Sequence, residues 1–102
     1  MTPLTYKFGN QIFKLYDDSP DALLEIHWTH TIWARLLIRL DGTSEVTTPA
    51  IPRFFNAWSI REAQWRYAAI IRKGCEAGGT SAYQILQAHF EERKLRSGIR
   101  NS

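Results

Sequence analysis

The stretch 4–15, LTYKFGNQIFKL, decides the N-terminal half of the fold. Apolar and polar residues alternate on both sides of its centre, which is typical of half-buried strands. The central Gly9-Asn10 pair is typical of a two-residue type II′ turn, because glycine takes the positive φ that this turn needs. Pairing across the turn sets Tyr6 opposite Phe13 on one face of the sheet. The stretch therefore predicts a β-hairpin whose turn and hydrophobic pattern select the same register.

The residues that follow, up to position 48, predict further strands. Ser19 with a proline after it would also suit the start of a helix. Apolar residues alternate from 22 to 40, however, and many are β-branched or aromatic, which favours strands. The elements expected here are a turn at 17–21, strands at 23–28 and 32–40 joined near 29–31, an Asp41-Gly42 hairpin turn, and an edge strand at 43–48. Together they predict an antiparallel sheet of about five strands.

A capping box opens the first predicted helix. Ser59 can accept a hydrogen bond from the backbone N–H of Glu62, whose side chain reaches back to the cap. Helical periodicity then continues to Lys73, and Gly74 is a typical stop. The sequence predicts a helix over 60–73. Its buried side is expected to carry Ile60, Ala63, Tyr67, Ile70 and Ile71.

A second capping box runs from Ser81 to Gln84 and predicts another helix, from 82 to about 96. Gly98 is its expected stop, and 97–102 is expected to be a frayed tail. The apolar stripe of this helix is expected to comprise Ala82, Ile85, Leu86, His89 and Phe90.

Amphipathic helices and one-sided sheets bury their apolar faces against each other. The sequence therefore predicts an α+β fold in the order β-β-β-β-β-α-α, in which two C-terminal amphipathic helices pack on an antiparallel N-terminal sheet or small open barrel. We expect a single domain over 1–102, with a sheet part at 1–48 and a helical part at 59–96.

Composition limits the class of protein. The chain has 102 residues, of which 44% are hydrophobic and 23% charged, as in ordinary folded domains. No stretch is long and apolar enough to span a bilayer, and residues 1–10 lack the apolar segment of a signal peptide, so no membrane partner is expected. The single cysteine, Cys75, cannot form an internal disulfide, and a cytoplasmic location is expected.

Charge divides the chain into an acidic and a basic half. Residues 1–52 hold four basic and six acidic side chains, a net charge of −2, whereas 53–102 hold nine basic and four acidic ones, a net charge of +5. Such asymmetry suggests an anionic or acidic partner on the basic side, although an ordinary solvated surface explains it as well.

The first predicted helix carries the strongest candidate for a binding surface. Arg61, Trp65 and Arg72 fall within about 40° of one another on the helical wheel, with Arg66 and Lys73 near the rim. Such a face can stack on a nucleic-acid base and pair with phosphates, or form a protein-binding hot spot. The alternative is that Trp65 is buried and the arginines are merely solvated.

A second basic cluster lies at the end of the second predicted helix. It comprises Arg93, Lys94, Arg96 and Arg100. Cations at a helix C-terminus interact favourably with the helix dipole, and two neighbouring glutamates reduce the net charge, so this cluster has an explanation that needs no ligand.

A third candidate surface lies on the strand predicted at 32–40. Strict alternation places Trp33, Arg35, Leu37 and Arg39 on one face, which could serve as a recognition platform. The aromatic signature of RNA-recognition sheets is absent, and arginines at the edge of a helix-covered face are the alternative.

Catalysis and metal binding have no support in the sequence. In a strand, His27 and His30 face opposite sides and cannot join Glu25 around one metal ion. His89 lies on an apolar helix stripe, where a semi-buried structural histidine is expected. Nothing marks Cys75 as a nucleophile, and no phosphate-binding loop is present. We therefore expect a protein that is not an enzyme and has no cofactor.

Several positions in the predicted helices suggest a family resemblance: Glu62-Ala63, Tyr83, Leu86-Gln87 and Phe90. With the predicted layout, they resemble the small cyanobacterial transcriptional co-activators that couple a Tudor-like β-domain to two C-terminal helices. The resemblance implies a non-enzymatic adaptor that binds a regulator or RNA polymerase.

These observations predict a small regulatory binding module that engages a protein or a nucleic acid through the basic-aromatic helix face. The alternatives are the co-activator-like adaptor and a self-associating structural protein, for which the strand at 43–48 offers a free edge and a homodimer is possible.

Overall fold

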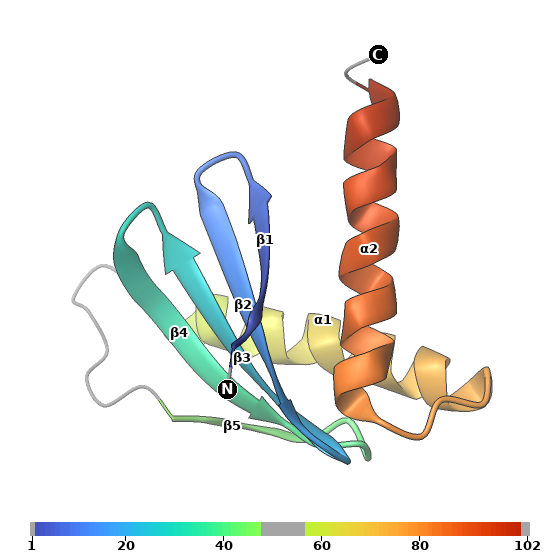
Figure 1. The fold of residues 1–102 in the computed structure, drawn as a ribbon. Helices are drawn as coiled ribbons and strands as arrows, with labels where there is room; N and C mark the ends of the chain where they lie inside the picture. Colours follow the sequence, from blue (N-terminus) through green and yellow to red (C-terminus); the bar gives the residue numbers. More distant parts are fainter. Residues whose placement is uncertain (1, 48–56, 101–102) are drawn as a thin grey trace.

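The computed structural model describes residues 2–47 and 57–100, and it has the α+β fold that the sequence predicts. Five antiparallel strands form one open sheet in the order β1-β2-β3-β4-β5, and two helices follow (Figure 1). The elements are β1 (Leu4–Phe8), β2 (Gln11–Asp18), β3 (Asp21–Trp28), β4 (Thr31–Ile38), β5 (Ser44–Val46), α1 (Ala57–Glu76) and α2 (Ala82–Arg100).

The first hairpin forms as predicted. Tyr6 pairs with Phe13, and Gly9 has a φ of 61°, the left-handed conformation that the turn requires. The turn between β2 and β3 is shorter than the predicted 17–21, because both strands extend until only Ser19 and Pro20 connect them.

The β4–β5 connection lies at the predicted Asp41-Gly42 but is longer than a two-residue turn. The N–H of Gly42 donates to the carbonyl of Arg39 (3.0 Å), and the N–H of Arg39 donates to the carbonyl of Thr43 (2.9 Å). The predicted strand over 32–40 therefore ends two residues early, at Ile38. The edge strand is also shorter than predicted, because β5 comprises three residues, and Thr48 lies outside the described residues.

Helix α1 extends beyond the predicted 60–73 at both ends. Ser59 lies inside the helix and is not its N-cap, so the predicted start is wrong. Gly74 does not stop the helix either. Gly78 does, with a φ of 97°, while the Gly79 N–H reaches back to the carbonyl of Gly74 (2.8 Å) and the Gly78 N–H to that of Cys75 (3.0 Å).

Helix α2 begins where the sequence predicts and ends later. Ser81 caps it, since its Oγ accepts a hydrogen bond from the N–H of Gln84 (3.4 Å). The helix continues through Gly98 to Arg100, so the predicted stop and the frayed tail from 97 are wrong as far as residue 100. A glycine inside a helix costs only about 1 kcal/mol relative to alanine, which neighbouring residues can offset.

Both helices pack on the same face of the sheet. Helix α1 runs across the strands, and α2 is steeply inclined to α1 (Figure 1). One core cluster joins the two layers, and its fully buried large side chains are Phe90, Leu15, Leu24, Leu36, Ile38, Ile71 and Leu86. Neither helix covers the opposite face of the sheet, which we call the open face.

Candidate binding surfaces

The outward side of α1 carries the residues that the sequence singled out, and we call Arg61, Trp65, Arg66, Arg72 and Lys73 the α1 surface. All five side chains are exposed, and 69% of the Trp65 surface is accessible to solvent. The orientation follows from helical periodicity, because Ala63, Tyr67 and Ile71 on the other side are buried in the core. The predicted exposure of Trp65 is confirmed, whereas binding at this surface stays a prediction.

The positive charges of the α1 surface are exposed to solvent. Among residues 2–47 and 57–100, ion pairs involve Glu25, Glu45 and Glu92, and none of them includes a cation of the α1 surface. Arg66 differs from the others in position, since it also lines a cleft of about 230 Å³ between α1 and the sheet, beside Trp33 and Tyr67.

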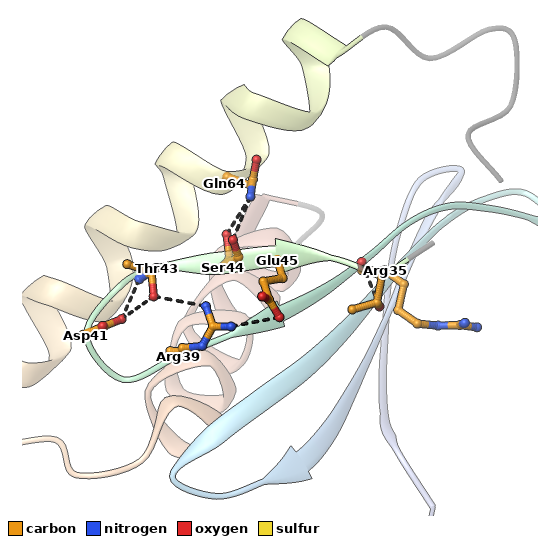
Figure 2. Close-up of polar contacts among 8 residues, drawn as sticks. Arg35, Arg39, Asp41, Thr43, Ser44, Glu45 and Gln64 are labelled. Atoms are coloured by element: carbon orange, nitrogen blue, oxygen red, sulfur yellow. Dashed lines mark hydrogen bonds and ion pairs between the residues drawn. The ribbon is translucent and has the colours of Figure 1, made fainter. Parts of the chain in front are cut away.

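The β4–β5 hairpin supports α1 from one side (Figure 2). The side-chain amide of Gln64 donates to the carbonyl and to the hydroxyl of Ser44, both at 3.1 Å. In the loop, Gly42 is buried and packs closely against α1: a Cβ added at this position would lie 3.5 Å from the carbonyl oxygen of Ala68. These contacts fix the hairpin against the helix and occupy one backbone carbonyl of the edge strand.

Polar contacts within this hairpin engage Arg39, which the sequence placed on a recognition platform. Its guanidinium pairs with Glu45 (2.8 Å) and donates to the Thr43 hydroxyl (3.3 Å), as Figure 2 shows. Hydrogen bonds from the hydroxyl and the backbone N–H of Thr43 lower the pKa of Asp41. Arg39 therefore has a structural role in the turn.

The residues of the second basic cluster differ in their surroundings, and binding there stays a prediction. The Arg93 guanidinium lies over the ring of Phe8, 4.1 Å from its centroid, and 5.4 Å from that of Phe13. Arg96 forms an exposed i,i+4 ion pair with Glu92 (3.8 Å). Lys94 is exposed, and the side chain of Arg100 lies outside the described residues. Arg93 thus covers the aromatic edge of the core.

The predicted placement of Trp33 is wrong because of a β-bulge. The β3–β4 register shifts between Ile26 and His27, so Ile26 pairs with Ala34 and His27 with Ile32. Trp33 is the additional residue, and it packs against the core rather than sharing the open face with Arg35. Strict alternation gave the wrong face because a bulge leaves no mark in the local sequence.

The open face holds a pocket that the sequence reasoning missed. Tyr16 pairs with Leu23, and Leu23 pairs with Leu37, so these three half-buried side chains form one row across the sheet. With Asp17, Asp18, Arg35 and Thr47 they line a wide-open hollow of about 550 Å³, which we call the open-face pocket. The alternation of β2, β3 and β4 contained this signal, in apolar residues on the face opposite the core.

A polar network lies beside this row. Glu25 is 8% exposed, and its carboxylate accepts from Arg35 Nε (2.9 Å) and contacts a terminal nitrogen of the same guanidinium (2.7 Å). His27 Nε2 lies 3.2 Å from the carboxylate, and the Tyr16 hydroxyl donates to it over 3.4 Å. Burial raises the pKa of Glu25, but the hydrogen bonds and charges of His27 and Arg35 outweigh it, so this pKa lies below its usual value.

The remaining candidates are the possible metal ligands and the single cysteine. His89 and Cys75 both contact neighbouring groups of the protein. In the described part of the chain no three His, Cys, Asp or Glu side chains converge as metal ligands. His89 lies half-buried against the Phe90 ring, and burial together with the charge of Arg93 lowers its pKa. Cys75 donates from Sγ to the carbonyl of Leu40 (3.4 Å).

The chain matches no family model, no curated protein and no solved structure. In the described ranges, neither helix is long and apolar enough to cross a membrane.

Proposed function

We propose that the protein is a small, non-enzymatic binding module that docks an acidic segment of a protein partner on the α1 surface. The observation that carries the proposal is Trp65, which is 69% exposed on a helix that is otherwise anchored in the core. Arg61 and Arg72 lie on the same side of the helix, and neither joins an ion pair within the described residues.

The chemistry of the α1 surface suits a contact hot spot. Tryptophan and arginine are the residues most enriched at such points, because a large apolar ring and a planar cation gain most from a well-packed contact. Burying a large apolar side chain contributes about 2 kcal/mol, and flanking arginines can add bidentate pairs with carboxylates. An acidic segment with an apolar anchor fits this combination.

A protein partner is favoured over a nucleic acid. Glu62 and Glu76 are exposed on the same helix and reduce the positive potential there. Phosphate tracks are bound by broader basic surfaces, whereas a single tryptophan among a few arginines is typical of protein contacts. The resemblance to transcriptional co-activators suggests a transcription regulator or the polymerase as candidate partners.

The edge strand supports self-association less well. Strand β5 has three residues, and its Ser44 carbonyl already accepts from Gln64. A strand added there would find few free backbone groups, so we do not propose pairing at this edge.

The test is capture of a partner from an extract of the native host, followed by titration of the identified partner. We expect Trp65→Ala and Arg61→Glu to weaken binding at least tenfold, because each removes a hot-spot contact. Leu95→Ala and Lys94→Glu are matched controls, since both residues are exposed on α2, Leu95 at 68%.

Equal binding by Trp65→Ala and wild type would refute the proposal. Loss of capture after nuclease treatment, with a log-affinity slope of about −0.9 per phosphate against log salt, would instead identify a nucleic-acid partner.

A further inference from the structure

We infer that the α1 surface of one copy docks into the open-face pocket of a second copy, so that the chain associates head to tail. This inference rests on the α1 surface being a contact surface, as in the proposed function, and adds a second partner for it. The supporting observation is that the α1 surface and the open-face pocket are complementary: both expose apolar side chains, and their flanking charges are opposite in sign.

The pocket has room and apolar walls for an indole ring. Its volume is about 550 Å³, and Tyr16, Leu23 and Leu37 line it in one cross-strand row. All three side chains are only half-buried on a face that no described helix covers. Removing them and Trp65 from water together would stabilise a contact.

The charges around the two surfaces are opposite in sign. Asp17 and Asp18 lie at the pocket and are exposed, while Arg61 and Arg72 flank Trp65. Arg35, the cation of the pocket, is neutralised by its ion pair with Glu25. An inserted Trp65 would therefore bring guanidinium groups to a rim whose exposed charges are carboxylates.

The two surfaces cannot meet within one molecule. The buried side of α1 faces the sheet, so its exposed side points away from the molecule, and the open face lies on the far side of the sheet. A contact between them is consequently heterologous, with one donor and one acceptor surface per copy. Association would also cover the α1 surface and compete with the protein partner.

The test uses two variants that each lose one surface. Trp65→Ala damages the donor and keeps the pocket, whereas Asp18→Arg damages the pocket rim and keeps the donor. We expect wild-type protein to show a mass in light scattering that rises with concentration, and each variant alone to associate at least tenfold more weakly. Mixed together, they should form a one-to-one complex, because the intact donor of one fits the intact pocket of the other.

Leu95→Ala, an exposed apolar change on α2, should associate like wild type, and circular dichroism confirms that each variant is folded. Wild-type protein that stays monomeric at all concentrations overturns the inference. A mixture of the two variants that forms no one-to-one complex also overturns it, and this is the result expected if the dimer joined two α1 surfaces. The proposed function fails separately, through partner capture that survives Trp65→Ala. If the protein is monomeric and its capture of a partner depends on Trp65 but not on Asp18, the proposed function holds and the inferred self-association is wrong.

Discussion

Glu25 shows how a charged side chain is kept at the centre of a half-apolar sheet surface. Its carboxylate contacts Arg35, His27 and Tyr16, so the buried charge of Glu25 has three polar partners. Removing one member of such a network leaves the other polar groups buried without a partner. The resulting loss of folding free energy exceeds what an intact ion pair contributes to stability. The same contacts raise the pKa of Tyr16, through burial first and the charge of Glu25 second.

Acid titration tests this network. The pKa of Glu25 is depressed in the folded state from a usual value of 4.5, so its stabilising contribution is complete above that pH and is lost as the pH falls through the folded pKa. We expect Glu25→Gln to be less stable than wild type near neutral pH, with the difference narrowing below pH 4.5 in urea unfolding. The exposed Glu76→Gln should follow wild type, and an unchanged difference for Glu25→Gln at all pH values would contradict the account.

At the level of elements, the two helices are positioned by contacts that neither helix specifies alone. The N–H of Ala82, at the start of α2, donates to the carbonyl of Pro20 in the β2–β3 turn (2.8 Å), and the hydroxyl of Ser81 lies 3.1 Å from that of Ser19. The turn thus completes the cap of α2. The end of α1 and the first turn of α2 also approach closely, at Gly74 and Ile85.

Gly74 is required by this approach. A Cβ added at Gly74 would lie 2.4 Å from Cγ2 of Ile85, closer than packed atoms can come. Alanine is the better helix former by about 1 kcal/mol, yet we expect Gly74→Ala to destabilise the protein by about 1–3 kcal/mol, measured by chemical denaturation. In the double variant with Ile85→Ala, the added cost of Gly74→Ala should disappear. Additive costs would show that the glycine serves another purpose.

Across the whole molecule, one aromatic cluster joins the two layers. The Phe90 ring is fully buried, stacks on Tyr6 with centroids 5.1 Å apart, and contacts Phe13 at 5.0 Å. Tyr6 belongs to β1 and Phe13 to β2, so this single residue of α2 ties the helical layer to the first hairpin. Trp65 is the opposite case, because its side chain contributes little to the core.

We expect Phe90→Ala to lower the free energy of unfolding by about 3–5 kcal/mol, as truncation of a buried aromatic ring does. Trp65→Ala should change it by less than about 0.5 kcal/mol, as an exposed substitution does. Urea denaturation of both variants checks this contrast. A large loss for Trp65→Ala would mean that its ring supports the fold and is not reserved for a partner.

The sequence by itself determined the features that arise from local periodicity and local hydrogen bonding. The Gly9-Asn10 turn and the alternation around it fixed the register of Tyr6 against Phe13. Ser81 marked the start of α2, and the helical period placed Trp65 on the exposed side of α1. Each of these depends on residues at most a few positions apart.

Only the tertiary structure decided the features that join distant residues. The C-terminal end of α1 depends on its surroundings. Gly74 lies within the helix and packs closely against Ile85, and the helix is terminated at Gly78. A bulge moved Trp33 to the core side of the sheet, and the placement of both helices on one face left the other face open. Packing between elements is nonlocal: the alternation of β2, β3 and β4 marks apolar residues opposite the core, but it does not show that both helices leave this face uncovered.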